Sequence, residues 1–156
     1  LQAVAQHHER PDGKGYPRGL GDLGELALLL NRVDAFTARF SARVIRQAMP
    51  ADAAVRQFFA ADPKSPHAAA IVKEFGLYPP GCSVRLKSGE AGIVMRRGAT
   101  ATTPVVAVLT TRNGDPLMQP VKRDTQQAEN AVAAVLPAAA IKVRLPVENL
   151  VACCAH

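Results

Sequence analysis

The chain has 156 residues, of which 48% are apolar and 21% are charged, as is ordinary for a globular protein. Collagen, coiled coil and wholesale disorder are thereby excluded, and the short apolar runs predict no membrane-spanning segment. Lysine and arginine number 19 against 13 aspartates and glutamates. This net charge of +6 favours an anionic partner without choosing between phosphates, nucleotides, nucleic acid and an acidic lipid surface.

Cysteines and aromatic residues narrow the class of protein further. The three cysteines, two of them adjacent, argue against a disulfide scaffold and favour a reducing cytoplasm. Aromatic residues make up only 4% of the chain, which argues against a protein that stacks single-stranded bases. The chain begins at Leu1 inside an expected helix and without an initiating methionine, so we expect a fragment of a longer protein.

The first half of the chain, to about Phe75, is expected to be helical. Its exception is residues 11–24, which hold five of the 11 glycines together with two prolines and therefore predict a loop. Gly76 suits the end of the last helix, because glycine readily takes up the conformation that follows a helix. The apolar spacing predicts helices at 1–10, 23–47 (one helix, or two with a break), 51–61 and 66–75.

The second half changes to a period of two. Residues 84–95 alternate between apolar and polar or small side chains around Ser88-Gly89-Glu90, which predicts a hairpin. Residues 104–111 predict a third strand with a turn at 113–115. We also expect a helix at 124–136 and a last strand at 141–145.

The fold class that follows is α+β. The Tyr78-Pro79-Pro80-Gly81 segment is expected to join two domains, 1–77 and 78–156. The first is expected to hold helices of an incomplete bundle, and the second a small antiparallel β-sheet or barrel with one helix.

The side chains best suited to metal chemistry are two adjacent histidines and an aspartate. His7 and His8 point about 100° apart on a helix, so two neighbouring metal ions could take one each. Asp34 lies in an otherwise apolar helical run, where a carboxylate is costly to bury unless it meets a cation or a metal. This donor set suits iron, manganese or zinc. The alternatives are solvated histidines and an ion pair of Asp34 with Arg32 or Arg39.

The loop that follows the histidines is suited to an anion. Gly13 and Gly15 let backbone N–H groups approach an anion closely, and Lys14 between them supplies positive charge. The alternative is an ordinary turn.

The order of these residues resembles the HD-GYP family, metal-dependent phosphohydrolases of bacterial signal transduction that cleave cyclic di-GMP. The family's signature is matched nearly residue for residue by His7-His8-Glu9-Arg10-x-Asp12-Gly13-x-Gly15-Tyr16-Pro17-x-Gly19-Leu20. The resemblance continues through Val33-Asp34-Ala35-Phe36, Ser41-Ala42-Arg43, the Tyr78–Gly81 link and the hairpin after it. It therefore covers most of the chain.

The resemblance implies an HD-type helical bundle and specific roles for several residues. His7, His8 and Asp34 would be ligands of a bi- or trinuclear iron or manganese centre. Arg43, with Lys14, would hold a substrate phosphate, as suits arginine. The GYP loop, here defined as Asp12, Gly13, Gly15, Tyr16 and Pro17, would shape the mouth of the site and a surface for a diguanylate cyclase or another signalling protein.

Departures from the family pattern bear on activity. The family's name-giving His-Asp pair and its other upstream ligands would lie before Leu1, so the metal site is expected to be incomplete in this chain. Arg43 lies nine positions after Asp34, about 180° round a continuous helix, and reaches the same site only if the helix breaks near Ser41. We therefore expect the chain to be inactive by itself.

Three functions remain open from the sequence. The first is the C-terminal portion of a phosphohydrolase that cleaves cyclic di-GMP, or a related cyclic dinucleotide, through a metal-bridged water. The alternative is a degenerate, non-catalytic module that binds a partner protein or a nucleotide. A weaker third is nucleic-acid binding by basic residues of the second half, against which stands a merely solvated face. Bare apolar helical faces at Leu26–Leu30 and Phe36–Phe40 also predict a homo-oligomer.

Overall fold

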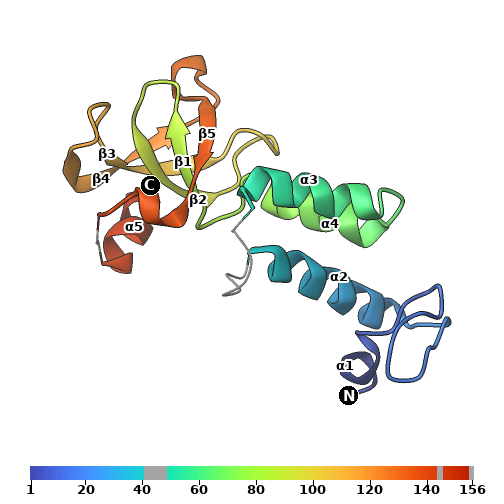
Figure 1. Cartoon of the computed structure of the whole chain (residues 1–156). Coiled ribbons are helices and arrows are strands. Elements are labelled where there is room, and N and C mark those ends of the chain that lie inside the picture. Colours follow the sequence, from blue (N-terminus) through green and yellow to red (C-terminus); the bar gives the residue numbers. More distant parts are fainter. Residues whose placement is uncertain (41–48, 144–145, 155–156) are drawn as a thin grey trace.

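The computed structural model describes residues 1–40, 49–143 and 146–154, with a helical part and a β-rich part that lie next to each other (Figure 1). The helices are α1 (Gln2–Gln6), α2 (Glu25–Phe40), α3 (Ala51–Ala61), α4 (Pro66–Phe75) and α5 (Val147–Cys154). The strands are β1 (Ser83–Leu86), β2 (Ala91–Arg96), β3 (Val105–Thr110), β4 (Pro116–Asp124) and β5 (Val132–Leu136), with short 3₁₀ turns at η1 (Ala128–Asn130) and η2 (Ala138–Ala140). The expected α+β class is confirmed.

The helical part is held together by an aromatic and aliphatic core between α2, α3 and α4. Phe36 of α2 is 4% exposed, and its ring centroid lies 5.1 Å from that of Phe58 on α3 and 5.4 Å from that of Phe75 on α4. Ser65 begins α4 by accepting a hydrogen bond from the Ala68 N–H, which satisfies one free donor of the first turn.

The β-rich part is one antiparallel sheet with the strand order β4-β3-β2-β1-β5. The interior strand β3 is buried along its whole length, and α5 lies against β4, β3 and β2. The hydrophobic core of the β-rich part consists of Val84, Leu86, Val94, Val106 and Val108. Gly92 is required on β2, because a Cβ there would lie 2.2 Å from the carbonyl oxygen of Ala107 on β3.

Backbone hydrogen bonds join the end of α4 to the segment between β2 and β3. The Leu77 N–H donates to the Ala101 carbonyl over 2.7 Å, and Arg97 Nη1 donates to the Lys73 carbonyl in the last turn of α4. A Cβ on Gly76 would lie 3.0 Å from the Ala101 oxygen, so the chain passes close at this point. The two parts are therefore joined by specific contacts as well as by the covalent link.

Several expected elements are confirmed. The helices at 51–61 and 66–75, the hairpin of β1 and β2 and the strand at 104–111 all occur. The first helix is shorter than expected and ends at Gln6, and α2 extends to Phe40. Residues 23 and 24 of the predicted helix 23–47 precede α2, and residues 41–47 lie outside the described residues, as does any break near Ser41.

Two expected elements are wrong. Residues 124–136 do not form a helix: β4 ends at Asp124, η1 follows, and Val132–Leu136 forms β5. Tertiary pairing with β1 overrides the weak helical preference of this alanine-rich stretch. The expected strand at 141–145 is absent over the described residues 141–143. Strand β4 was not predicted from the sequence, and its two prolines are tolerated because it is an edge strand.

The exposed helical face matches the expectation in part. Leu26 is 61% exposed on α2, whereas Phe36 is buried in the core. In the described part of the chain, no helix combines the length and the hydropathy needed to cross a membrane.

Candidate functional site

The two histidines lie side by side at the end of α1. Their ring centroids are 3.8 Å apart, and the His8 ring stacks on Tyr16 with centroids 4.7 Å apart. His7 Nδ1 lies 2.6 Å from the Val4 carbonyl, and because a carbonyl only accepts, Nδ1 must carry the hydrogen. Nε2 of His7 is then the basic nitrogen, and donation of the other ring N–H to a backbone carbonyl is the usual arrangement of a metal-binding histidine.

Glu9 anchors the loop that follows. Its side chain is 1% exposed, and its carboxylate accepts hydrogen bonds from the backbone N–H groups of Arg18 at 2.7 Å and Leu20 at 3.0 Å. Two N–H donors compensate a carboxylate that would otherwise be costly to bury. Glu9 therefore ties the far end of the loop to the end of α1.

The near side of the same loop is shaped by Asp12. One carboxylate oxygen accepts from Arg10 Nη2 at 2.8 Å, and the other accepts from the Lys14 N–H at 3.1 Å. Both oxygens of Asp12 are thus used within the loop, and the Lys14 side chain is left exposed. Lys14 is free to meet an anion from solvent.

Gly15 is the point where the loop crosses the backbone of α1's end. A Cβ on Gly15 would lie 2.3 Å from Glu9 Cα, so only glycine permits this approach. The next residue, Tyr16, donates its N–H to the His8 carbonyl at 3.3 Å and is 61% exposed. The Tyr16–Pro17 peptide bond is cis. The GYP loop consequently lies over His8 and presents Tyr16 to solvent.

Helix α2 carries the third predicted ligand, Asp34, and contacts the end of α1 through Asn31. Asn31 Nδ2 donates to the His7 carbonyl at 2.7 Å, which fixes α2 against the end of α1. Asp34 follows one turn later on a neighbouring part of the helix surface and is exposed. Neither arginine that could have paired with it does so: Arg32 binds Asp62, and Arg39 donates to the Ala35 carbonyl.

The described residues supply suitable donor types for iron or manganese but not a complete site. In residues 1–40, 49–143 and 146–154, no group of three or more His, Cys, Asp or Glu side chains is arranged to hold a metal ion. Arg43, the expected phosphate-binding residue, lies outside the described residues.

Two residues of this region received no role from the sequence. Glu9 lies inside the signature motif. Its role could have been predicted, because a carboxylate next to a glycine-rich loop can accept hydrogen bonds from the backbone N–H groups of that loop. Asn31 had no comparable signal, because its partner is a backbone carbonyl distant in sequence.

Comparison with known proteins agrees with the motif. The chain is 38% identical over 131 residues to the cyclic di-GMP phosphodiesterase PA4108 of Pseudomonas aeruginosa, a match that covers 78% of this chain and 31% of the relative. The chain thus spans less than a third of the length of the relative that it matches. No family model matches the chain, and no solved structure matches it significantly. The signature motif resembles that of the HD-GYP family, and the similarity to a cyclic di-GMP phosphodiesterase supports this resemblance.

Proposed function

We propose that the chain is the C-terminal portion of a metal-dependent phosphohydrolase that cleaves the phosphodiester bonds of cyclic di-GMP. The observation that carries the proposal is the packing of the GYP loop on the histidine pair. Tyr16 stacks on His8 while Glu9 holds the loop, so the signature residues form one structural unit. The relative's name, a cyclic di-GMP phosphodiesterase, supports the choice of substrate.

In this proposal His7, His8 and Asp34 contribute part of a bi- or trinuclear iron or manganese centre. The remaining ligands come from outside the described residues. When bound, such a centre supplies an activated water and charge stabilisation at phosphorus. Within this chain, the Val4 carbonyl orients His7, Asn31 fixes α2 against α1, and Tyr16 orients His8 by stacking.

Phosphate binding and partner binding are assigned to the loop side of the site. Lys14 is exposed and meets substrate phosphate as a point charge, together with Arg43. The exposed Tyr16 and its neighbours in the GYP loop offer a surface to a diguanylate cyclase or another signalling protein.

The test is hydrolysis of cyclic di-GMP by the full-length protein that carries this chain, loaded with iron or manganese. His8→Ala and Asp34→Ala are each expected to lower kcat/KM by at least ~100-fold, because each removes a metal ligand. Asp22→Ala, an exposed carboxylate in the same loop region, is the matched control and should stay within about twofold.

Metal content provides the second readout. Elemental analysis of the 156-residue chain alone should give well under one metal ion per chain, and the full-length protein about two. A full-length protein that holds its metals but does not hydrolyse cyclic di-GMP would contradict the enzymatic proposal. That result would favour the alternative of a non-catalytic module that binds a partner protein or a nucleotide.

A further inference from the structure

The β-rich part contains a cavity of about 870 Å³, away from the histidine pair. Its walls come from the turn between β1 and β2, from the turn between β3 and β4, from β4 itself and from η1 with the residue before it. Small-molecule sites are concave and typically about 300–1,000 Å³ in volume. The cavity is therefore large enough for a ligand of nucleotide size.

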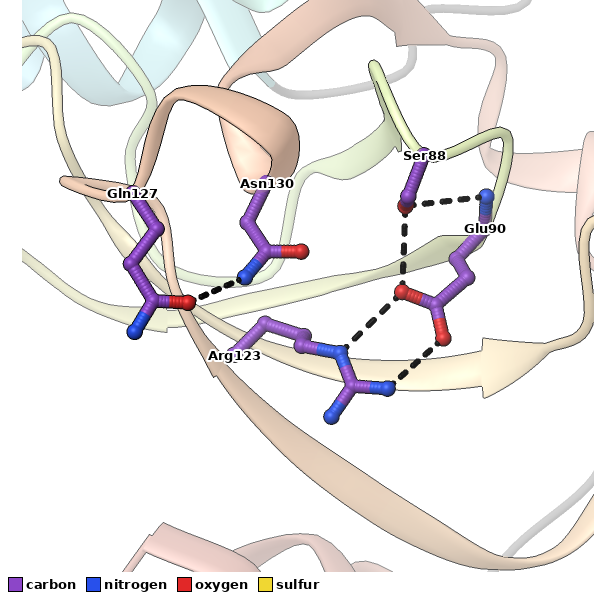
Figure 2. A network of polar contacts seen from close by, with 5 residues as sticks. All are labelled: Ser88, Glu90, Arg123, Gln127 and Asn130. Carbon is purple, nitrogen blue, oxygen red and sulfur yellow. Dashed lines mark hydrogen bonds and ion pairs between the residues drawn. The ribbon is translucent and has the colours of Figure 1, made fainter.

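One wall is held by a network of polar contacts (Figure 2). Glu90 accepts hydrogen bonds from Arg123 Nε at 3.1 Å and Nη2 at 2.9 Å, and from Ser88 Oγ at 3.0 Å. The hydrogen bonds from Arg123 hold the pKa of Glu90 below its ordinary value, so the pair is ionised at neutral pH. Both oxygens of Glu90 are thus used, and this wall is pre-organised with no net charge.

Two other polar residues that line the cavity can still bind a ligand, one by accepting a hydrogen bond and one by its positive charge. Asn130 is only 6% exposed, and its Nδ2 donates to Gln127 Oε1 at 2.8 Å. Within the described residues its Oδ1 meets no donor, and Figure 2 shows that oxygen turned toward the side of Ser88 and Glu90. Lys122 is half-buried, and among the residues that the structure describes it has no ion-pair partner. An acceptor atom that is open to the cavity can take a hydrogen bond from a ligand, and a half-buried cation favours an anion.

These requirements select a class of ligand. Arg112 and Lys122 line the cavity as cations suited to a phosphate. Asn130 and Glu129 also line the cavity, and an amide oxygen and a carboxylate are acceptors that can meet N–H donors of a ligand. Guanine presents such donors at N1 and N2, whereas adenine has a donor beside an acceptor on that edge. Guanine also offers O6 and N7 to a guanidinium group.

We propose that this cavity is a second ligand site that binds a guanine mononucleotide. Complete hydrolysis of cyclic di-GMP, with one water per phosphodiester bond, yields two molecules of this nucleotide, so the site would let the protein sense the product of its proposed function. Binding itself does not depend on that function, because no residue of the histidine pair or the GYP loop lines the cavity.

The test is calorimetric titration of the metal-free chain with GMP, AMP and inorganic phosphate. GMP is expected to bind, with AMP and inorganic phosphate each at least about tenfold weaker. Lys122→Gln should weaken GMP binding about tenfold by removing one of the cations that line the cavity. Lys87→Gln, an exposed lysine of the β1–β2 turn that does not line the cavity, removes the same charge and should change affinity less than twofold.

Three outcomes would overturn the proposal. The first is no heat of GMP binding at about 5 mM nucleotide, the weak end for a specific site. The second is inorganic phosphate bound as tightly as GMP, which would reduce the site to an anion site. The third is an equal loss of affinity in Lys87→Gln and Lys122→Gln. None of these readouts involves metal or hydrolysis, so failure here is distinguishable from failure of the enzymatic proposal.

Discussion

At the scale of single residues, Glu9 is the most consequential side chain of the loop region. A buried carboxylate is tolerated there only because two backbone N–H groups converge on it. The same two bonds fix Arg18 and Leu20, and with them the return of the loop toward α1.

Glu9→Gln tests this role without changing the shape of the side chain. The amide keeps one acceptor and turns an NH₂ group toward the other backbone N–H, so one buried donor loses its partner. We expect the free energy of unfolding to fall by about 1–3 kcal/mol, and amide exchange at Arg18 and Leu20 to become faster. Glu74→Gln, an exposed glutamate on α4, is the control. Unchanged exchange at both amides would contradict the assignment.

Glu90 gives a pH-dependent prediction. Its hydrogen bonds from Arg123 lower its pKa in the folded state, so the stability that it adds is present above the ordinary glutamate range and is lost as pH falls through the folded pKa. The pair is partly exposed and screened, so we expect Glu90→Gln to cost about 1 kcal/mol at pH 7. Urea unfolding of the wild type and the variant should show this difference shrink toward zero at strongly acidic pH. A constant difference would contradict it.

At the scale of elements, the GYP loop depends on one close backbone approach. Gly15→Ala would place a Cβ 2.3 Å from Glu9 Cα, so the loop must move away from the end of α1. We expect a loss of about 2–3 kcal/mol in unfolding free energy and loss of the ring-current shift that Tyr16 imposes on His8 in NMR spectra. Gly24→Ala is the matched control, because nothing lies within 4 Å of a Cβ there. Equal effects of the two substitutions would contradict this account.

Elements defined by local chemistry were predicted well from the sequence. The helix at 66–75 has Ser65 before it and Gly76 after it, and both signals act within one turn of the helix. Residues 132–136 show the opposite case. Their sequence, Val-Ala-Ala-Val-Leu, is compatible with helix or strand, and β5 forms because β1 supplies its hydrogen-bond partners. No pattern within residues 132–136 specifies that β1 will be their pairing partner.

At the scale of the whole molecule, the exposed apolar residues of the N-terminal helices predict self-association. Leu26 and Val4 are 61% and 63% exposed, although large apolar patches are normally covered. We expect the chain to form dimers at ~100 µM in sedimentation velocity, and Leu26→Glu to shift it toward monomer. Met118→Glu adds the same charge at an exposed position on β4, outside the N-terminal helices, and should leave the dimer intact. A monomeric wild type at that concentration would contradict the prediction.

The sequence by itself determined the α+β class, the helices flanked by clear start and stop residues, the first hairpin and the resemblance to the HD-GYP family. Each rests on local periodicity, on turn chemistry or on the order of residues in one short segment. Only the tertiary structure decided that Glu9 holds the loop, that Asn31 fixes α2 against His7, and that Asn130 faces a cavity. These roles depend on partners brought together by the folding of distant segments, which no local pattern encodes.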